Sequence, residues 1–264
     1  MPQLEVPGGD AGGETIHYQR AGSGAKVIVL VHGFGADARS WTMNQPALAA
    51  AATVYALDLP GHGASPARDI GGLDRMAGIV AEAIAALTPE PVHLVGHSMG
   101  GAISLRVAEL TPAAVRALTL IAPAGVGSGR NIGFMPAYMA MEDEPSAEHA
   151  LRMLFNHPAL INRQTIEGVL ASRREPHIYA AWQAMRLVGG EVWARPAAAR
   201  AALAALSIPV QILWGERDAV LPPEGLDMLP PNVRLHRIPD AGHAAHMEAA
   251  KTVNRLILEF DALA

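Results

Sequence analysis

Hydrophobic positions along the chain follow two patterns, short continuous apolar runs and longer stretches with helical spacing. Residues 27–31 read Val-Ile-Val-Leu-Val, which predicts a strand buried on both faces. Residues 14–20 alternate polar and apolar positions, which is typical of a half-exposed strand. Further strands are predicted at residues 53–57, 92–95, 115–121, 208–215 and 234–238. Helices are predicted at residues 41–51, 73–87, 102–110, 197–205 and 245–262.

This alternation of strands and helices is interrupted once. Between residues 126 and 195 no buried-strand pattern occurs, and the methionine-rich segment indicates several short helices. Repeated β–α units predict an α/β fold with a mostly parallel central sheet flanked by helices. We therefore divide the chain into a core, residues 1–125 and 196–264, and a helical cap, residues 126–195. Because ligands bind beyond the carboxyl ends of parallel strands, we expect the cap to lie over that edge.

Residues 96–100, Gly-His-Ser-Met-Gly, stand between a predicted strand and a predicted helix. In this setting the G-x-S-x-G pattern forms a nucleophile elbow, a sharp turn that exposes the serine hydroxyl above the sheet. The turn brings the backbone on either side of the serine nearly into contact, and Gly96 and Gly100 leave room for that approach. The pattern therefore predicts Ser98 as a nucleophile.

A serine hydroxyl is a weak nucleophile at neutral pH, so Ser98 needs a histidine base and a buried carboxylate that orients the histidine. In the elbow fold these residues follow in the order serine, acid, histidine. His243 comes after the last predicted strand, and Asp218 comes after the strand before it. We assign these two residues as base and acid. Glu216 is the alternative acid, whereas Asp240 is interpreted as a turn residue because it is too near His243 in sequence.

Two backbone N–H groups must stabilise the oxyanion that forms when the serine attacks a carbonyl. The predicted donors are Met99, directly after the nucleophile, and Phe34, in a Gly-rich loop after an early strand. His32 and His97 flank these donors and are interpreted as structural residues. The Gly-rich loop at residues 58–65 is interpreted as a stabilising turn near the site.

Methionine and aromatic side chains recur within the predicted cap. Flexible thioethers suit a pocket that accepts varied apolar groups, and an apolar roof would exclude water from the reacting atoms. We name Met139, Met153 and Trp182 as candidate substrate-binding residues. The alternative interpretation is that these side chains belong to an ordinary hydrophobic core.

Composition narrows the chemistry and the partners of the predicted site. The 264 residues carry a formal net charge of −5 and no run of Lys or Arg, which argues against nucleic acid or an anionic membrane as partner. The chain has no cysteine and shows no ligand cluster, so we expect neither a metal nor a cofactor. No apolar run reaches the roughly 18 residues that span a bilayer, and residues 1–10 do not resemble a signal peptide. We expect a cytoplasmic protein.

Across essentially its whole length the sequence resembles the α/β-hydrolase superfamily. The resemblance rests on the short segments at residues 32–35, 58–65, 96–101, 214–218 and 242–243. It implies the α/β-hydrolase fold with a helical cap insertion and a Ser-Asp-His triad. The serine at the elbow argues against the haloalkane dehalogenase and epoxide hydrolase branches. A resemblance to those enzymes would require Asp at this position.

Within this superfamily, residues 58–65, 155–160 and 246–248 are most similar to the hydrolase domain of acetoin dehydrogenase dihydrolipoamide acetyltransferase proteins. That resemblance implies acyl transfer to a lipoyl thiol. No lipoyl or subunit-binding domain precedes residue 14, so we expect a free-standing hydrolase instead. The cap is also similar to that of carbon–carbon bond hydrolases acting on ring-cleavage products.

The leading hypothesis is a serine hydrolase that cleaves short- to medium-chain carboxylic esters, its small-molecule partners, through an acyl-enzyme. The same three residues could also serve a carbon–carbon bond hydrolase or an acyltransferase. A slow-turnover ligand-binding protein that keeps the triad is a third hypothesis. The fold alone does not separate these activities.

Overall fold

The computed structural model describes residues 2–6, 13–67, 69–193 and 196–264. Within them the strands form one 8-stranded sheet in the order β1-β2-β4-β3-β5-β6-β7-β8. Neighbours from β4 to β8 are parallel, whereas β2 runs antiparallel to both β1 and β4. The strands are β1 (Gln3–Val6), β2 (Glu14–Ala21), β3 (Val27–Val31), β4 (Thr53–Leu57), β5 (Val92–His97), β6 (Val115–Ile121), β7 (Val210–Gly215) and β8 (Val233–Ile238).

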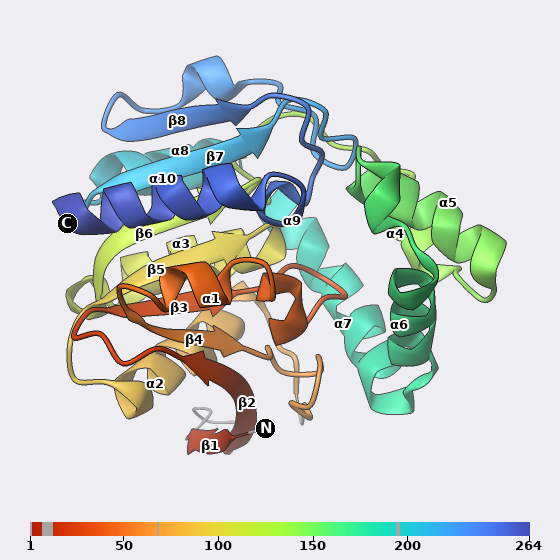
Figure 1. Ribbon diagram of the computed structural model, residues 1–264, viewed down its shortest axis with the longest axis horizontal. Coiled ribbons are helices and arrows are strands. Elements are labelled where there is room, and N and C mark those ends of the chain that lie inside the picture. Colours follow the sequence, from red (N-terminus) through yellow and green to blue (C-terminus); the bar gives the residue numbers. More distant parts are fainter. Residues whose placement is uncertain (1, 7–12, 68, 194–195) are drawn as a thin grey trace.

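Helices cover both faces of the sheet (Figure 1). One face carries α2 (Leu73–Leu87), α3 (Met99–Leu110) and α8 (Pro196–Ala205), and the other carries α1 (Gln45–Leu48) and α10 (Ala250–Leu263). Because both faces are covered, a central strand such as β3 buries all of its side chains. The α/β fold with a mostly parallel sheet, predicted from the apolar runs, is confirmed.

Between β6 and β7 the described chain forms helices and no strand. These are α4 (Phe134–Met139), α5 (Glu144–Leu154), a 3-10 turn (Pro158–Leu160), α6 (Arg163–Arg174) and α7 (Pro176–Trp193), after which α8 returns to the sheet. In Figure 1 the arrowheads of the parallel strands point toward α4–α7, so these helices lie beyond the carboxyl ends of the strands. Residues 126–195 are therefore the proposed cap.

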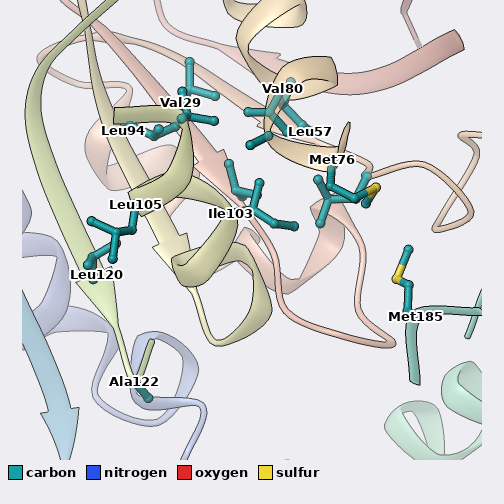
Figure 2. Packing of buried hydrophobic residues seen from close by; sticks show 14 of the residues in the cluster. Val29, Leu57, Met76, Val80, Leu94, Ile103, Leu105, Leu120, Ala122 and Met185 are labelled. Atoms are coloured by element: carbon teal, nitrogen blue, oxygen red, sulfur yellow. The ribbon is translucent and has the colours of Figure 1, made fainter. Parts of the chain in front are cut away.

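The main hydrophobic core lies between the sheet and the helices α2 and α3 that cover one of its faces. Figure 2 shows Val29 and Leu94 from neighbouring strands together with Val80 from α2 in this cluster. Met185 of α7 belongs to the same cluster, and in Figure 2 its side chain points toward Met76. The last helix of the proposed cap is therefore packed into the core of the sheet, not loosely appended to it.

Two helices predicted from the sequence are shorter than expected. The stretch at residues 41–51 contains only the end of a 3-10 turn (Ala38–Trp41) and the short α1. Pro46 lies at the start of α1, and a proline ring would clash with the carbonyl four residues earlier in a longer helix. The stretch at 245–262 divides at Ala249 into α9 (Ala245–Glu248) and α10. None of the described helices is long and apolar enough for a membrane span.

Candidate active site

The backbone turns sharply at Ser98, between β5 and α3. Its φ of 53° and ψ of −116° lie in a region that side chains rarely adopt. A Cβ atom added at Gly96 would lie 2.4 Å from the carbonyl oxygen of Gly100, and one added at Gly100 would lie 2.3 Å from that of His32. Both positions therefore require glycine, as the sequence pattern predicts, and Ser98, which is partly buried, is held at the start of α3.

Three predicted residues from three loops meet in one series of hydrogen bonds. Ser98 Oγ lies 2.9 Å from His243 Nε2, and His243 Nδ1 lies 2.8 Å from Asp218 Oδ2. The second oxygen, Asp218 Oδ1, accepts the N–H groups of Val220 and Leu221 at 2.9 and 2.7 Å. A carboxylate only accepts, so His243 Nδ1 carries the proton and Nε2 is free to accept one from Ser98.

The other two carboxylates considered in the sequence lie outside this series. Glu216 is exposed, and only its backbone N–H makes a described bond, to the carbonyl oxygen of Ile238 at 3.0 Å. Asp240 has a φ of 60° at the turn before the His243 loop, and its carbonyl accepts the Asn156 amide at 2.7 Å. Asp240 is thus a turn residue, and the structure brings Asp218 rather than Glu216 to the histidine.

The N–H groups of Phe34 and Met99 donate no hydrogen bond within the described part of the chain. Met99 begins α3, where the first N–H groups of a helix have no partner inside the helix. A Cβ atom added at Gly33 would lie 3.2 Å from Ser98 Cβ, so the loop that carries Phe34 lies directly against the elbow. Two free donors beside a nucleophile can stabilise a developing oxyanion.

Two buried histidines hold the Phe34 loop in place. His32 Nε2 accepts the Leu59 N–H at 3.0 Å, and His62 Nε2 accepts the Gly35 N–H at 3.2 Å. Burial lowers the pKa of both imidazoles, that of His62 to about 3. Both rings are therefore neutral acceptors at neutral pH, which is the structural role expected of His32.

The rings of two further histidines, His97 and His246, lie beside His243 in tilted contact. His97 lies 4.9 Å from His243 between ring centroids, and its Nε2 donates to the His243 carbonyl oxygen at 3.0 Å. His246 lies 4.4 Å from His97 and 4.5 Å from Trp41. Burial holds the pKa of His97 well below its usual value and lowers that of His246 to about 3. Sequence reasoning assigned no role to His246, although it stands in the segment 246–248 that carries the family resemblance.

An aromatic cluster connects the proposed cap with the Phe34 loop. The Trp182 ring of α7 lies 5.7 Å from Phe34 and 5.3 Å from Tyr138 of α4, measured between centroids. Tyr138 also donates its hydroxyl to the Gly35 carbonyl at 3.2 Å. Trp182, a predicted substrate-binding residue, is fully buried in this cluster.

The two candidate methionines lie in other parts of the proposed cap. Met153 Sδ lies 3.9 Å from the Asn131 amide nitrogen, which donates to the carbonyl of Ala219, next to Asp218, at 2.9 Å. Met139 is half-buried in α4, and its carbonyl accepts from Arg173 Nε at 3.3 Å. The structure thus places Met153 near the acid loop and Trp182 at the Phe34 loop. That these side chains bind substrate stays a prediction.

No group of His, Cys, Asp or Glu side chains within the described ranges is arranged to hold a metal ion. What the site contains is a serine with a hydrogen-bonded base, a carboxylate that orients the base, and two free N–H donors. This arrangement can transfer an acyl group to Ser98 and from there to a second nucleophile.

Comparisons with known proteins identify the family of the chain. A family model described as the alpha/beta hydrolase family matches residues 28–256. The chain is 37% identical over 253 residues to the dihydrolipoyllysine-residue acetyltransferase component of the acetoin cleaving system of Pseudomonas putida, covering 95% of this chain and 68% of that protein. It is 32% identical over 249 residues to the pimeloyl-(acyl-carrier protein) methyl ester esterase of Methylococcus capsulatus, covering 88% and 93% respectively.

Among solved structures, a meta-cleavage product hydrolase from Pseudomonas fluorescens superposes with a TM-score of 0.86 at 22% identity. The match covers 98% of this chain and 97% of that one, and it shows the shared fold. The resemblance inferred from the sequence motifs is confirmed by these matches.

Proposed function

The chain belongs to the alpha/beta hydrolase family, and from this premise we propose that it is a serine hydrolase of short- to medium-chain carboxylic esters. The observation that carries the proposal is the hydrogen-bonded series from Ser98 through His243 to Asp218, with Ser98 only partly buried at a strained turn. The predicted roles of nucleophile, base and acid rest on these distances.

The proposed reaction proceeds through an acyl-enzyme. As Ser98 Oγ attacks the ester carbonyl, its proton passes to His243 Nε2, and the resulting imidazolium is stabilised by Asp218. The oxyanion accepts the N–H groups of Phe34 and Met99. The carbon–oxygen bond of the ester breaks, and His243 returns the proton to the leaving alcohol. Water then repeats the attack with His243 as base, which releases the acid and free Ser98.

Two observations support an ester with an apolar acyl or alcohol chain as substrate. The methyl ester esterase of Methylococcus capsulatus is similar over 88% of this chain. Two helices of the proposed cap place aromatic side chains against the Phe34 loop, where Trp182, Tyr138 and Phe34 form one cluster. An apolar roof favours binding of an apolar chain and excludes bulk water from the acyl-enzyme.

Acyl transfer to a thiol is the second candidate, favoured by the 37% identity to the acetoin-system acetyltransferase component. Both activities form the same acyl-enzyme and differ in the group that attacks it. A thiol acceptor would raise the rate of product release above the rate in water alone, whereas a strict hydrolase would show no such rise. The rate at which the acyl-enzyme breaks down, measured with and without a thiol, therefore identifies the acyl acceptor.

The experiment is a panel of p-nitrophenyl esters from acetate to octanoate, run with and without dihydrolipoamide and beside a ring-cleavage dienoate. We expect ester turnover that dihydrolipoamide leaves unchanged, and no cleavage of the dienoate. Ser98→Ala should lower the ester rate by about three to six orders of magnitude while the circular dichroism spectrum is unchanged. Cleavage of the dienoate alone, or a Ser98→Ala rate above about a tenth of wild type, would contradict the proposal.

A further inference from the structure

The carboxylate of Glu248, at the end of α9, bridges two segments that lie far apart in the sequence. Its Oε1 accepts the Gly242 N–H at 2.8 Å, in the loop that carries His243. Its Oε2 accepts the N–H groups of Asn156 and His157 at 2.8 and 2.9 Å, in the proposed cap just after α5. One side chain therefore joins the cap backbone to the histidine loop.

The two segments are in direct contact at this bridge. A Cβ atom added at Gly242 would lie 2.8 Å from the Asn156 nitrogen and 3.0 Å from the Leu154 carbonyl oxygen. The N–H of His243 donates to the same Leu154 oxygen at 3.0 Å. The Asn156 amide donates to the Asp240 carbonyl at 2.7 Å. The Leu154 carbonyl and the Asn156 side chain of the cap thus hold the loop at His243 and at Asp240.

The bridge partly removes a carboxylate from water, which costs free energy that an apolar side chain in the same place would not cost. Burial raises the pKa of the Glu248 carboxyl, while the three backbone N–H groups oppose that rise. A carboxylate withdrawn from water is retained where charge-assisted hydrogen bonds compensate its desolvation. The two oxygens of this carboxylate accept hydrogen bonds from two different segments. We take this double acceptance as the reason for a carboxylate at this position.

We propose that Glu248 is a positioning residue: it seats residues 154–157 of the cap on the histidine loop and so keeps the His243 ring in line with Ser98. The inference rests on the proposed function, because it takes Ser98 and His243 as the reacting pair. A displacement of about 1 Å between reacting groups lowers a rate by about a hundredfold, so small movements of this loop matter.

The test compares Glu248→Gln with Glu259→Gln, an exposed glutamate of α10 whose partner is Arg255. The glutamine amide matches the carboxylate in size but turns an NH₂ group toward N–H donors, so one side of the bridge is lost. The probe is a fluorophosphonate, which reacts with Ser98 through His243 and needs no particular ester. We expect Glu248→Gln to react about ten- to a hundredfold more slowly than wild type and Glu259→Gln to be unchanged.

A spectroscopic readout separates positioning from general stability. The His243 Nδ1 proton, hydrogen-bonded to Asp218, should give a downfield proton resonance. The chemical shift of this resonance should change in Glu248→Gln and should equal that of wild type in Glu259→Gln. A variant that is merely less stable would leave the resonance of its folded fraction in place. Should Glu248→Gln not fold, Glu248→Asp keeps the carboxylate on a side chain one methylene shorter, so it loses one side of the bridge and should slow phosphonylation by about tenfold.

The inference is overturned if the resonance does not shift and Glu248→Gln reacts within about twofold of the wild-type rate. Where Glu248→Asp is the variant measured, an unchanged rate overturns it. Failure of the proposed function gives a different result. A wild-type protein that is phosphonylated at Ser98 but cleaves no ester overturns ester hydrolysis and leaves the role of Glu248 standing. A wild-type protein that is not phosphonylated overturns both.

Discussion

Ser98 carries strain in its own backbone, and the surrounding hydrogen bonds hold it there. Its N–H donates to the Ile121 carbonyl at 2.9 Å, and its carbonyl accepts the N–H groups of Ala102 and Ala124 at 3.2 and 3.0 Å. A residue in such a conformation costs about 1–3 kcal/mol and persists where the surroundings determine it. The strain places the hydroxyl within reach of His243, so it is part of how the site works.

A second series of acid, histidine and hydroxyl shows that hydrogen bonding alone does not make an active site. Asp261 lies 3.0 Å from His93 Nδ1, and His93 Nε2 lies 2.7 Å from Thr119 Oγ1. Both His93 and Thr119 are 0% exposed, which leaves no access for a substrate. This series ties α10 to β5 and β6 and has a structural role. The Ser98 site differs in being accessible, strained and flanked by free N–H groups.

The order of residues in the sequence predicted the reacting groups but not the residues that hold them in position. Ser98, Asp218 and His243 each follow a strand, so topology alone brings them to one edge. Glu248 and His246 take their roles from contacts with residues far away in the chain, such as Asn156 and Trp41. A single sequence contains no local pattern for contacts of that kind.

At the residue scale, Asp218→Asn tests the acid assignment. An asparagine amide can donate to His243 Nδ1 and so favours the wrong tautomer, which should lower kcat by about four orders of magnitude. Glu216→Gln, two positions earlier and exposed, is the matched control and should stay near wild type. Steady-state hydrolysis of p-nitrophenyl butyrate measures both variants. The reverse ranking would transfer the acid role to Glu216.

At the scale of elements, the sequence predicted buried strands well and short irregular elements poorly. The bounds of β3, β4 and β6 match the predicted ranges residue for residue, because strands buried on both faces are mostly apolar. β1 was not predicted, since its four residues carry too short a pattern. The break at Ala249, where φ is −120° and ψ is 40°, has no glycine or proline to signal it.

The proposed cap is joined to three of the loops around the elbow, those that carry Phe34, Asp218 and His243. Tyr138 of α4 bonds to Gly35 in the Phe34 loop, and Asn131 bonds to Ala219 beside Asp218. The third contact is the Glu248 bridge at the His243 loop. A helical insertion with these attachments is positioned relative to the nucleophile, so it can form one wall of a defined pocket.

From this arrangement we predict a dependence of the rate on acyl chain length. Each buried methylene contributes up to about 0.8 kcal/mol, or roughly fourfold, so kcat/KM should rise from acetate to butyrate or hexanoate esters and then fall. Met139→Trp should narrow the pocket and move the optimum to shorter chains. The p-nitrophenyl ester series measures this shift. A flat profile that Met139→Trp leaves unchanged would show that the cap does not hold the acyl chain.

At the scale of the whole molecule, buried histidines link stability to pH. Burial lowers the pKa of His62 and of His246 to about 3 and lowers the pKa of His32, His93 and His97 as well. In the unfolded chain a histidine titrates near 6.5. Between these values the unfolded chain binds protons that the folded chain does not. Stability is therefore fully present above about pH 6.5 and is lost as the pH falls toward 3.

We therefore predict that the free energy of unfolding decreases between pH 6.5 and 4.5, by up to about 1.4 kcal/mol per pH unit for each of His62 and His246, whose pKa in the folded chain is about 3. Urea unfolding at intervals across this range measures the slope. His246→Leu removes one buried group whose ring nitrogens have no hydrogen-bond partner in the described chain, so the slope should decrease by about one histidine's share. His149→Leu, at an exposed position in α5, should leave the slope unchanged. Equal slopes for His246→Leu and wild type would show that His246 takes up its proton while the protein is still folded.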